Sequence, residues 1–162
     1  ITMQNHMPYH EWYENNDYPA ESTTGTPLGD DEQQSIETYQ KGVEITDQAT
    51  QEFLNELDAL DKPVTVVFYG DHLPGIYSSA SEDDNNSLAL HLTDYFIWSN
   101  KASSSQGNKA SDAAYSSPNF FVAQAADHMN AKVSPYLAFL TEMHSKIAAM
   151  EPPVVNLSLI HI

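Results

Sequence analysis

The sequence contains neither cysteine nor arginine among its 162 residues. Without cysteine there is no disulfide, no thiolate metal site and no cysteine nucleophile. All six basic residues are lysines, so no guanidinium of this chain can clamp a phosphate through two parallel hydrogen bonds. The net charge of −17 excludes the basic surface that binds nucleic acid. An acid excess of this kind is typical of a solvated surface, and attraction of cations is the weaker alternative.

Long hydrophobic runs are also missing. No stretch has the length of a membrane-spanning helix, and no signal peptide is visible. The chain nevertheless opens directly on Ile1, within an apolar-polar run, which we interpret as a cut inside a longer protein. These absences therefore say nothing about membrane attachment of that longer protein. Hydrophobic residues make up 41% of the chain, which indicates a folded domain rather than a disordered segment.

Helical periodicity is clearest between Asp31 and Ala59, where apolar residues recur on one face. Lys62-Pro63 ends this predicted helix, and an apolar, β-branched run follows over residues 64–69. A helix followed by such a run is half of an α/β unit, and the run suits a buried parallel strand. The sequence therefore predicts an α/β fold, with a partial, mostly parallel sheet flanked by helices.

Further elements are expected on both sides of this unit. Two strands are predicted within residues 1–7 and 95–98, and two helices are predicted from Pro118 to Asn130 and from Ser134 onward. The polar stretches at residues 78–87 and 101–117 predict surface loops.

The sharpest local motif is Gly70-Asp71-His72, which directly follows the predicted strand at residues 64–69. In open α/β sheets, ligand sites form at the carboxyl ends of strands. A carboxylate beside an imidazole suits Mn²⁺ or Zn²⁺. The motif therefore indicates a metal site at Asp71 and His72. The alternative is a turn in which Asp71 caps a helix and His72 is merely exposed.

A second motif, Asn5-His6-Met7-Pro8-Tyr9, also follows a strand-like run and contains a proline. His6 could contact an anionic substrate or act as an acid, and the alternative is an ordinary loop histidine. Loops at the ends of parallel strands share one edge of a sheet. We therefore expect His6 within roughly 10 Å of Asp71 and His72, a span that one bound substrate could bridge.

The other histidines are weaker candidates for chemistry. His91 precedes the predicted strand at residues 95–98, and it either lines a pocket or simply packs. His128 and His144 lie on helical stripes, where a core or boundary histidine with its hydrogen bonds satisfied is expected.

Together these motifs carry a family resemblance over most of the chain between Thr2 and Ile147. The segments that carry it are Met3–Tyr9, Tyr39–Val43, Thr46–Ala49, Val66–Pro74, Thr93–Asn100, Ser117–Phe121 and Ser134–Tyr136. In order and spacing they resemble lipoteichoic-acid synthases and related phosphoglycerol transferases. These enzymes belong to the sulfatase and alkaline-phosphatase-like superfamily.

The resemblance implies that residues 1–156 are the C-terminal portion of a sulfatase-like catalytic domain. Asp71 and His72 would be two of its metal ligands, normally for Mn²⁺, although another divalent metal is possible. His6 would contact the phosphoglycerol group. The family's nucleophilic threonine, its glutamate ligand and its phosphate-binding arginine lie upstream of the matched segments. No catalytic residue is therefore assigned within this chain, and the fragment alone is expected to be inactive.

The resemblance also implies a reaction and a place. The full-length parent would move glycerophosphate from phosphatidylglycerol to a growing lipoteichoic acid chain. It would act at the outer face of the bacterial cell membrane, held there by N-terminal spans outside this chain, with no nucleic-acid partner. Two alternatives stay open: a hydrolase or phosphoethanolamine transferase of the same superfamily, and a catalytically dead surface-binding module.

The last residues, 157–162, read Leu-Ser-Leu-Ile-His-Ile and resemble a translated transposon-end sequencing adapter. On this interpretation the tail is non-native, and neither His161 nor the apparent glycosylation sequon at Asn156 carries a function. The tail should then make few contacts and form no sheet ladder. The alternative is a genuine apolar strand at the C-terminus.

Overall fold

The structure is a computed structural model that describes residues 5–9, 13, 14, 16, 18, 27–109 and 115–150. Two compact units divide the chain. Unit 1 comprises Ile1–Glu56 and Tyr69–Asp94, and unit 2 comprises Leu57–Phe68 and Tyr95–Ile162. Within the described ranges, no helix is both long enough and apolar enough to cross a membrane. The predicted boundary at residue 156 and the adapter-like tail at residues 157–162 lie outside the described residues.

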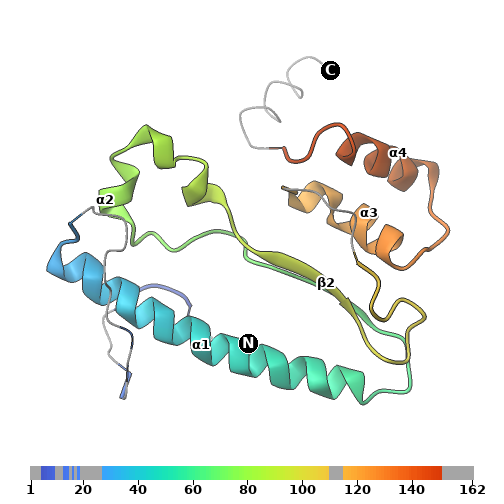
Figure 1. The fold of residues 1–162 in the computed structure, drawn as a ribbon, viewed down its shortest axis with the longest axis horizontal. Helices are drawn as coiled ribbons and strands as arrows, with labels where there is room; N and C mark the ends of the chain where they lie inside the picture. The colour runs from blue at the N-terminus through green and yellow to red at the C-terminus, as the bar shows by residue number, and fades with distance from the viewer. Residues whose placement is uncertain are drawn as a thin grey trace. The chain divides into compact units, whose positions relative to one another are not determined.

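Helix α1 runs from Asp30 to Asp58 (Figure 1) and confirms the helix predicted at residues 31–59. Acids at residues 30–32 occupy its first turn, where the helix dipole favours negative charge. Within unit 1, α1 buries Glu37, Thr38 and Gly42, and the side-chain amide of Asn16 donates a hydrogen bond to the Glu37 carbonyl at 3.1 Å. Helix α1 therefore contacts the segment that precedes it in unit 1.

Two strands, β1 (Thr65–Tyr69) and β2 (Tyr95–Ser99), form a two-stranded sheet. At one end the Asn100 amide donates to the Val64 carbonyl at 3.0 Å, and at the other the Gly70 amide donates to the Asp94 carbonyl at 3.2 Å. Facing residue numbers rise on one strand as they fall on the other, so the strands run antiparallel. Both strands were predicted at these positions, and both are confirmed.

The predicted parallel orientation is wrong for these two strands. The chain between them holds only short helices, namely α2 (Ser78–Ser81), η1 (Asp84–Asn86) and η2 (Ala89–His91), and it returns β2 alongside β1. A parallel neighbour would need a long crossover connection instead. Nor is β1 an internal strand here, because β2 is its one strand neighbour among the described residues. Phe68 and Tyr69 are 39% and 47% exposed, so the apolar run is not buried on both faces.

Unit 2 also contains two helices, α3 (Pro118–His128) and α4 (Pro135–His144), which confirm the predicted helix starts (Figure 1). Each has proline in its first turn, where the missing amide hydrogen costs nothing. The Ser134 hydroxyl oxygen caps α4 by accepting from the Leu137 amide at 3.3 Å. The two helices enclose a small apolar core of Phe120, Ala123 and Leu140.

Candidate functional site

The site begins at Gly70, the residue after β1, which Thr93 holds in place. The Thr93 hydroxyl donates to the Gly70 carbonyl at 2.7 Å. A Cβ at position 70 would lie 3.1 Å from the Thr93 Cβ, so glycine permits a close approach that alanine would oppose. Gly70 thus packs directly against Thr93, which fixes the start of the Asp71-His72 loop.

Asp71 and His72 then project into solvent, with side chains 82% and 78% exposed. Asp71 Oδ1 accepts the His72 amide at 3.0 Å, and the His72 Nδ1–H donates to the Leu73 carbonyl at 2.8 Å. A carbonyl can only accept, so Nδ1 carries a proton, and in the neutral ring the lone pair is on Nε2. Pro74 is buried just beyond, which anchors the loop. The two side chains are therefore held by local bonds while their outer atoms stay accessible.

This donor pair fits one divalent cation. His72 Nε2 and Asp71 Oδ2 are 3.8 Å apart, whereas metal–ligand bonds of about 2.1 Å allow two donors up to about 4.2 Å apart on one ion. The hydrogen bond from Nδ1 to a backbone carbonyl is the usual way in which a metal-binding histidine is oriented. The described residues contain no group of three or more His, Cys, Asp or Glu side chains that could hold a metal. The pair alone would supply only part of a coordination shell.

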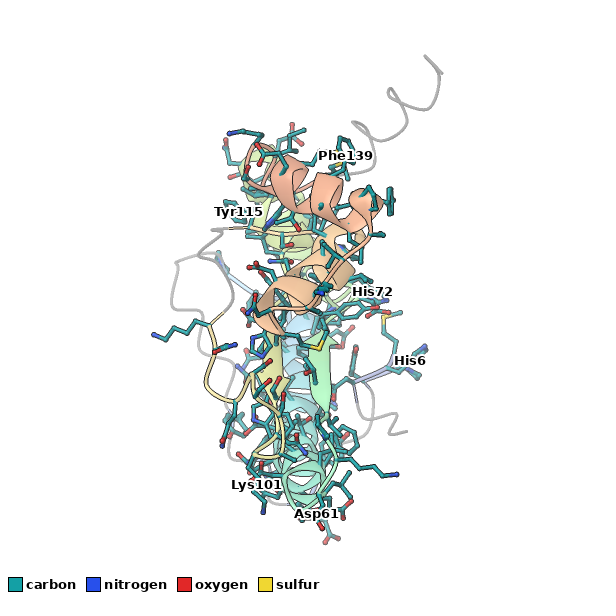
Figure 2. The ribbon with its side chains drawn as sticks, turned by 90° about the vertical axis from the view of Figure 1, so that its right-hand side faces the viewer. His6, Asp61, His72, Lys101, Tyr115 and Phe139 are labelled. Atoms are coloured by element: carbon teal, nitrogen blue, oxygen red, sulfur yellow. The ribbon has the colours of Figure 1, made fainter. Side chains whose placement is uncertain are left out.

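His6 lies in the loop from Asn5 to Tyr9, and its side chain projects away from the ribbon (Figure 2). Its Nδ1–H donates to the Met7 carbonyl at 2.7 Å, so its lone pair is also on Nε2. Residues 5–7 form a turn, and residues 1–4, where the preceding strand was predicted, lie outside the described residues. His6 and His72 thus share one arrangement: an exposed ring with Nδ1 fixed by the backbone of the next residue.

The His6 loop meets the segment that follows His72. The Met7 sulfur lies 3.8 Å from the place where a Cβ on Gly75 would be. The two segments line one pocket of about 300 Å³ together with the start of α1, through Met7, Pro8, Tyr9, Gly75, Ile76, Ser78, Asp31, Glu32 and Ser35. The Glu32 carboxylate, which lines this pocket, accepts from the backbone amide and the hydroxyl of Ser79. None of the residues lining this pocket is His6, Asp71 or His72, so the 10 Å span between them stays a prediction.

Three tyrosines of unit 1 interact with one another, and one of them, Tyr9, lines the pocket. Tyr9 is 5% exposed, and its ring meets Tyr39 edge-on at a centroid distance of 5.6 Å. Burial raises the pKa of Tyr9, Tyr39 and Tyr77. The charge that Tyr39 would carry raises the pKa of Tyr9 and Tyr77 further. All three therefore resist ionisation and remain hydrogen-bond donors well into alkaline pH.

The remaining described histidines, His91, His128 and His144, make their contacts elsewhere. His91 is exposed, and its Nδ1–H donates to the Ser87 carbonyl at 2.7 Å. His128 and His144 are buried as predicted, but the prediction that their hydrogen bonds are satisfied is wrong. Within the described part of the chain, His128 Nδ1 and His144 Nε2 have no hydrogen-bond partner.

Sequence reasoning missed the residues that hold the two loops. Thr93 was noted only as the first residue of a family motif, because a single threonine before a strand gives no sign of a contact with Gly70. Thr46 and Tyr39 were noted only as parts of a family motif, although they contact the His6 loop. Their spacing of seven residues on one helix was the available signal, since it places both on the same face.

Comparisons with known proteins agree with these motifs. The profile of the family described as Sulfatase matches residues 1–131. The phosphoglycerol transferase GacH of Streptococcus pyogenes, solved in complex with sn-glycerol-1-phosphate, is 35% identical, with a TM-score of 0.73. The similarity covers 98% of this chain and 40% of that one, so the chain spans less than half the length of its structural relative. No curated protein sequence matches. Because the Sulfatase profile matches most of this sequence, the chain belongs to the sulfatase family.

Proposed function

We propose that this chain is part of a phosphoglycerol transferase in which Asp71 and His72 bind a divalent cation, Mn²⁺ in the first instance, and His6 contacts the phosphoglycerol group. The observation that carries the proposal is the exposed Asp71-His72 pair after β1, with donor atoms 3.8 Å apart. The similarity to a transferase solved with sn-glycerol-1-phosphate supports the substrate class.

Each of the three side chains has a distinct task in this proposal. Asp71 supplies an anionic oxygen, and His72 supplies the Nε2 lone pair that its bond to Leu73 leaves outward. A bound cation supplies charge neutralisation at phosphoryl oxygens and lowers the pKa of a coordinated hydroxyl. His6 Nε2 can accept a hydrogen bond from a glycerol hydroxyl, which would orient the group beside the cation.

The proposal extends to the whole protein. Phosphatidylglycerol would be the donor, a growing lipoteichoic acid chain the acceptor, and the outer face of the bacterial cell membrane the place of reaction. A threonine nucleophile would come from a part of the protein outside this chain and form the phosphoglyceryl intermediate. These finer statements rest on the family resemblance.

The binding half of the proposal can be tested on the chain itself by NMR. Added Mn²⁺ should broaden the resonances of Asp71 and His72 before those of the rest of the chain. With Mg²⁺ as the diamagnetic cation, sn-glycerol-1-phosphate should shift the imidazole signals of His6 and His72, and phosphoethanolamine or sulfate should do so less. The matched control is His91→Ala, since His91 is also exposed with Nδ1 bonded to a backbone carbonyl. Equal responses to all three ligands would contradict the proposed substrate class.

A further inference from the structure

The loop that carries His6 is tied to α1 at both of its ends. At one end, the Thr46 hydroxyl donates to Asn5 Oδ1 at 2.8 Å. At the other end, the buried Tyr9 ring packs edge-on against Tyr39. His6 thus lies between two attachments to the same helix.

The loop is also closed upon itself. The Tyr9 hydroxyl donates to the Asn5 carbonyl at 2.6 Å, so Asn5 is held through both its side chain and its backbone. Because Asn5 directly precedes His6, fixing its carbonyl and its side chain restricts the backbone from which the imidazole projects. Met7, on the other side of His6, lies beside the segment at Gly75 and lines the same pocket.

Helix α1 sets the distance between the two attachments. Tyr39 and Thr46 are separated by seven positions, which corresponds to about two turns and about 10 Å along the helix axis. At that spacing both side chains lie on nearly the same face of the helix. The rigid helix therefore presents an aromatic ring and a hydroxyl at a fixed separation, and the loop from Asn5 to Tyr9 spans it.

We propose that Thr46 is a positioning residue for His6, acting through Asn5. The inference rests on the proposed function, because it matters only if His6 contacts the phosphoglycerol group. Tyr9 and Tyr39 form the buried, stability-bearing end of the loop, whereas the Thr46–Asn5 bond lies at the surface. Its loss should leave unit 1 folded and release only the His6 end.

Positioning effects of this kind show in ligand affinity rather than in folding. A catalytic or binding group that drifts by about an ångström loses much of its contribution, even though no contact to the ligand was deleted. A neutral hydrogen bond corresponds to roughly a five- to tenfold change in an equilibrium constant. Removal of the Thr46 hydroxyl should therefore weaken binding of sn-glycerol-1-phosphate by about that factor.

The experiment compares three substitutions in the complete chain. Thr46→Val keeps the shape of the side chain and removes the hydroxyl, and Thr46→Ser keeps the hydroxyl. Thr50→Val, one turn further along α1, is the matched control. For each, NMR titration with sn-glycerol-1-phosphate in the presence of Mg²⁺ gives the affinity, and ¹⁵N relaxation gives the mobility of residues 5–7. The midpoint of urea unfolding reports stability.

We expect Thr46→Val to weaken ligand binding about five- to tenfold and to increase the mobility of residues 5–7, at an unchanged unfolding midpoint. Thr46→Ser should bind like the parent chain, and so should Thr50→Val. If Thr46→Val unfolds, Asn5→Ala removes the same bond from the loop side and should give the same loss of affinity.

Two negative results would have different meanings. If the parent chain binds the ligand and His6→Ala weakens that binding, but Thr46→Val and Asn5→Ala do not, this inference is overturned and the proposed function stands. If His6 does not respond to the ligand in the parent chain, the proposed role of His6 fails, and the inference fails with it.

Discussion

The side-chain amide of Asn100 donates a hydrogen bond to the Leu57 carbonyl at 3.0 Å, across 43 positions of sequence. Asn100 has no solvent exposure, and the same amide group also donates to the Lys62 carbonyl at 2.9 Å. Its Oδ1 accepts the Val64 amide at 2.9 Å. One side chain thus joins the end of α1, the turn after it and the approach to β1.

Replacing Asn100 by alanine should destabilise the chain by about 3 kcal/mol. The change would leave the Val64 amide and the Leu57 and Lys62 carbonyls without this partner, and each buried unsatisfied group costs about 1–3 kcal/mol. Chemical denaturation followed by circular dichroism measures the loss. The control is Asn55→Ala at an exposed position on α1, which should cost less than about 0.5 kcal/mol. Equal losses for the two substitutions would contradict the role of Asn100.

A second prediction concerns the buried contact between Ser99 and His128. Ser99 Oγ lies 2.8 Å from Thr65 Oγ1 and 2.9 Å from His128 Nε2. Ser99→Ala would leave His128 Nε2 without this partner and should cost about 1–3 kcal/mol. In a double-mutant cycle with His128→Phe, we expect a coupling of about 1 kcal/mol in the free energy of unfolding. Strictly additive losses would show that the contact contributes nothing.

Local signals in the sequence predicted most of the helices and strands. The amphipathic pattern of residues 31–59 predicted α1. Pro118 and Ser134-Pro135 predicted the starts of α3 and α4. These features depend on periodicity and capping, which neighbouring residues determine. The position of Asp71 after β1 was predictable for the same reason, since a strand and its following turn are adjacent in sequence.

Strand orientation and loop anchoring could not be predicted in this way. Whether β1 pairs with a parallel or an antiparallel neighbour depends on how the chain between Gly70 and Asp94 returns, and its polar composition allows either course. The role of Asn100 depends on the carbonyls of Leu57, Leu60 and Lys62, which lie 38 to 43 positions earlier in the sequence and converge on its side-chain amide. A single asparagine after a strand gives no sequence signal of such convergence.

A third prediction concerns metal affinity. Asp71 and His72 supply two donors at an exposed loop, and tight metal sites usually have three or more protein ligands. Isothermal titration of the chain with Mn²⁺ should therefore give a dissociation constant no tighter than about 10⁻⁶ M. His72→Ala should abolish the binding, whereas His91→Ala should not change it. Submicromolar affinity in the parent chain would mean that further ligands complete the site.

The last prediction concerns alkaline pH and the three interacting tyrosines of unit 1. Burial raises the pKa of Tyr9, Tyr39 and Tyr77, so the folded state holds these protons more tightly than the unfolded state, in which the pKa is about 10. Their contribution to stability is therefore complete below about pH 10 and is lost as pH rises through the raised folded-state pKa values. Tyr39→Phe removes one ionisation and lowers the pKa of Tyr9 and Tyr77, so the fall in unfolding free energy above pH 10 should become shallower. Urea unfolding across this range, with tyrosinate absorbance recorded in parallel, measures both effects. The exposed Tyr136→Phe is the control, and if it flattens the curve as much as Tyr39→Phe, the buried tyrosines are not the cause.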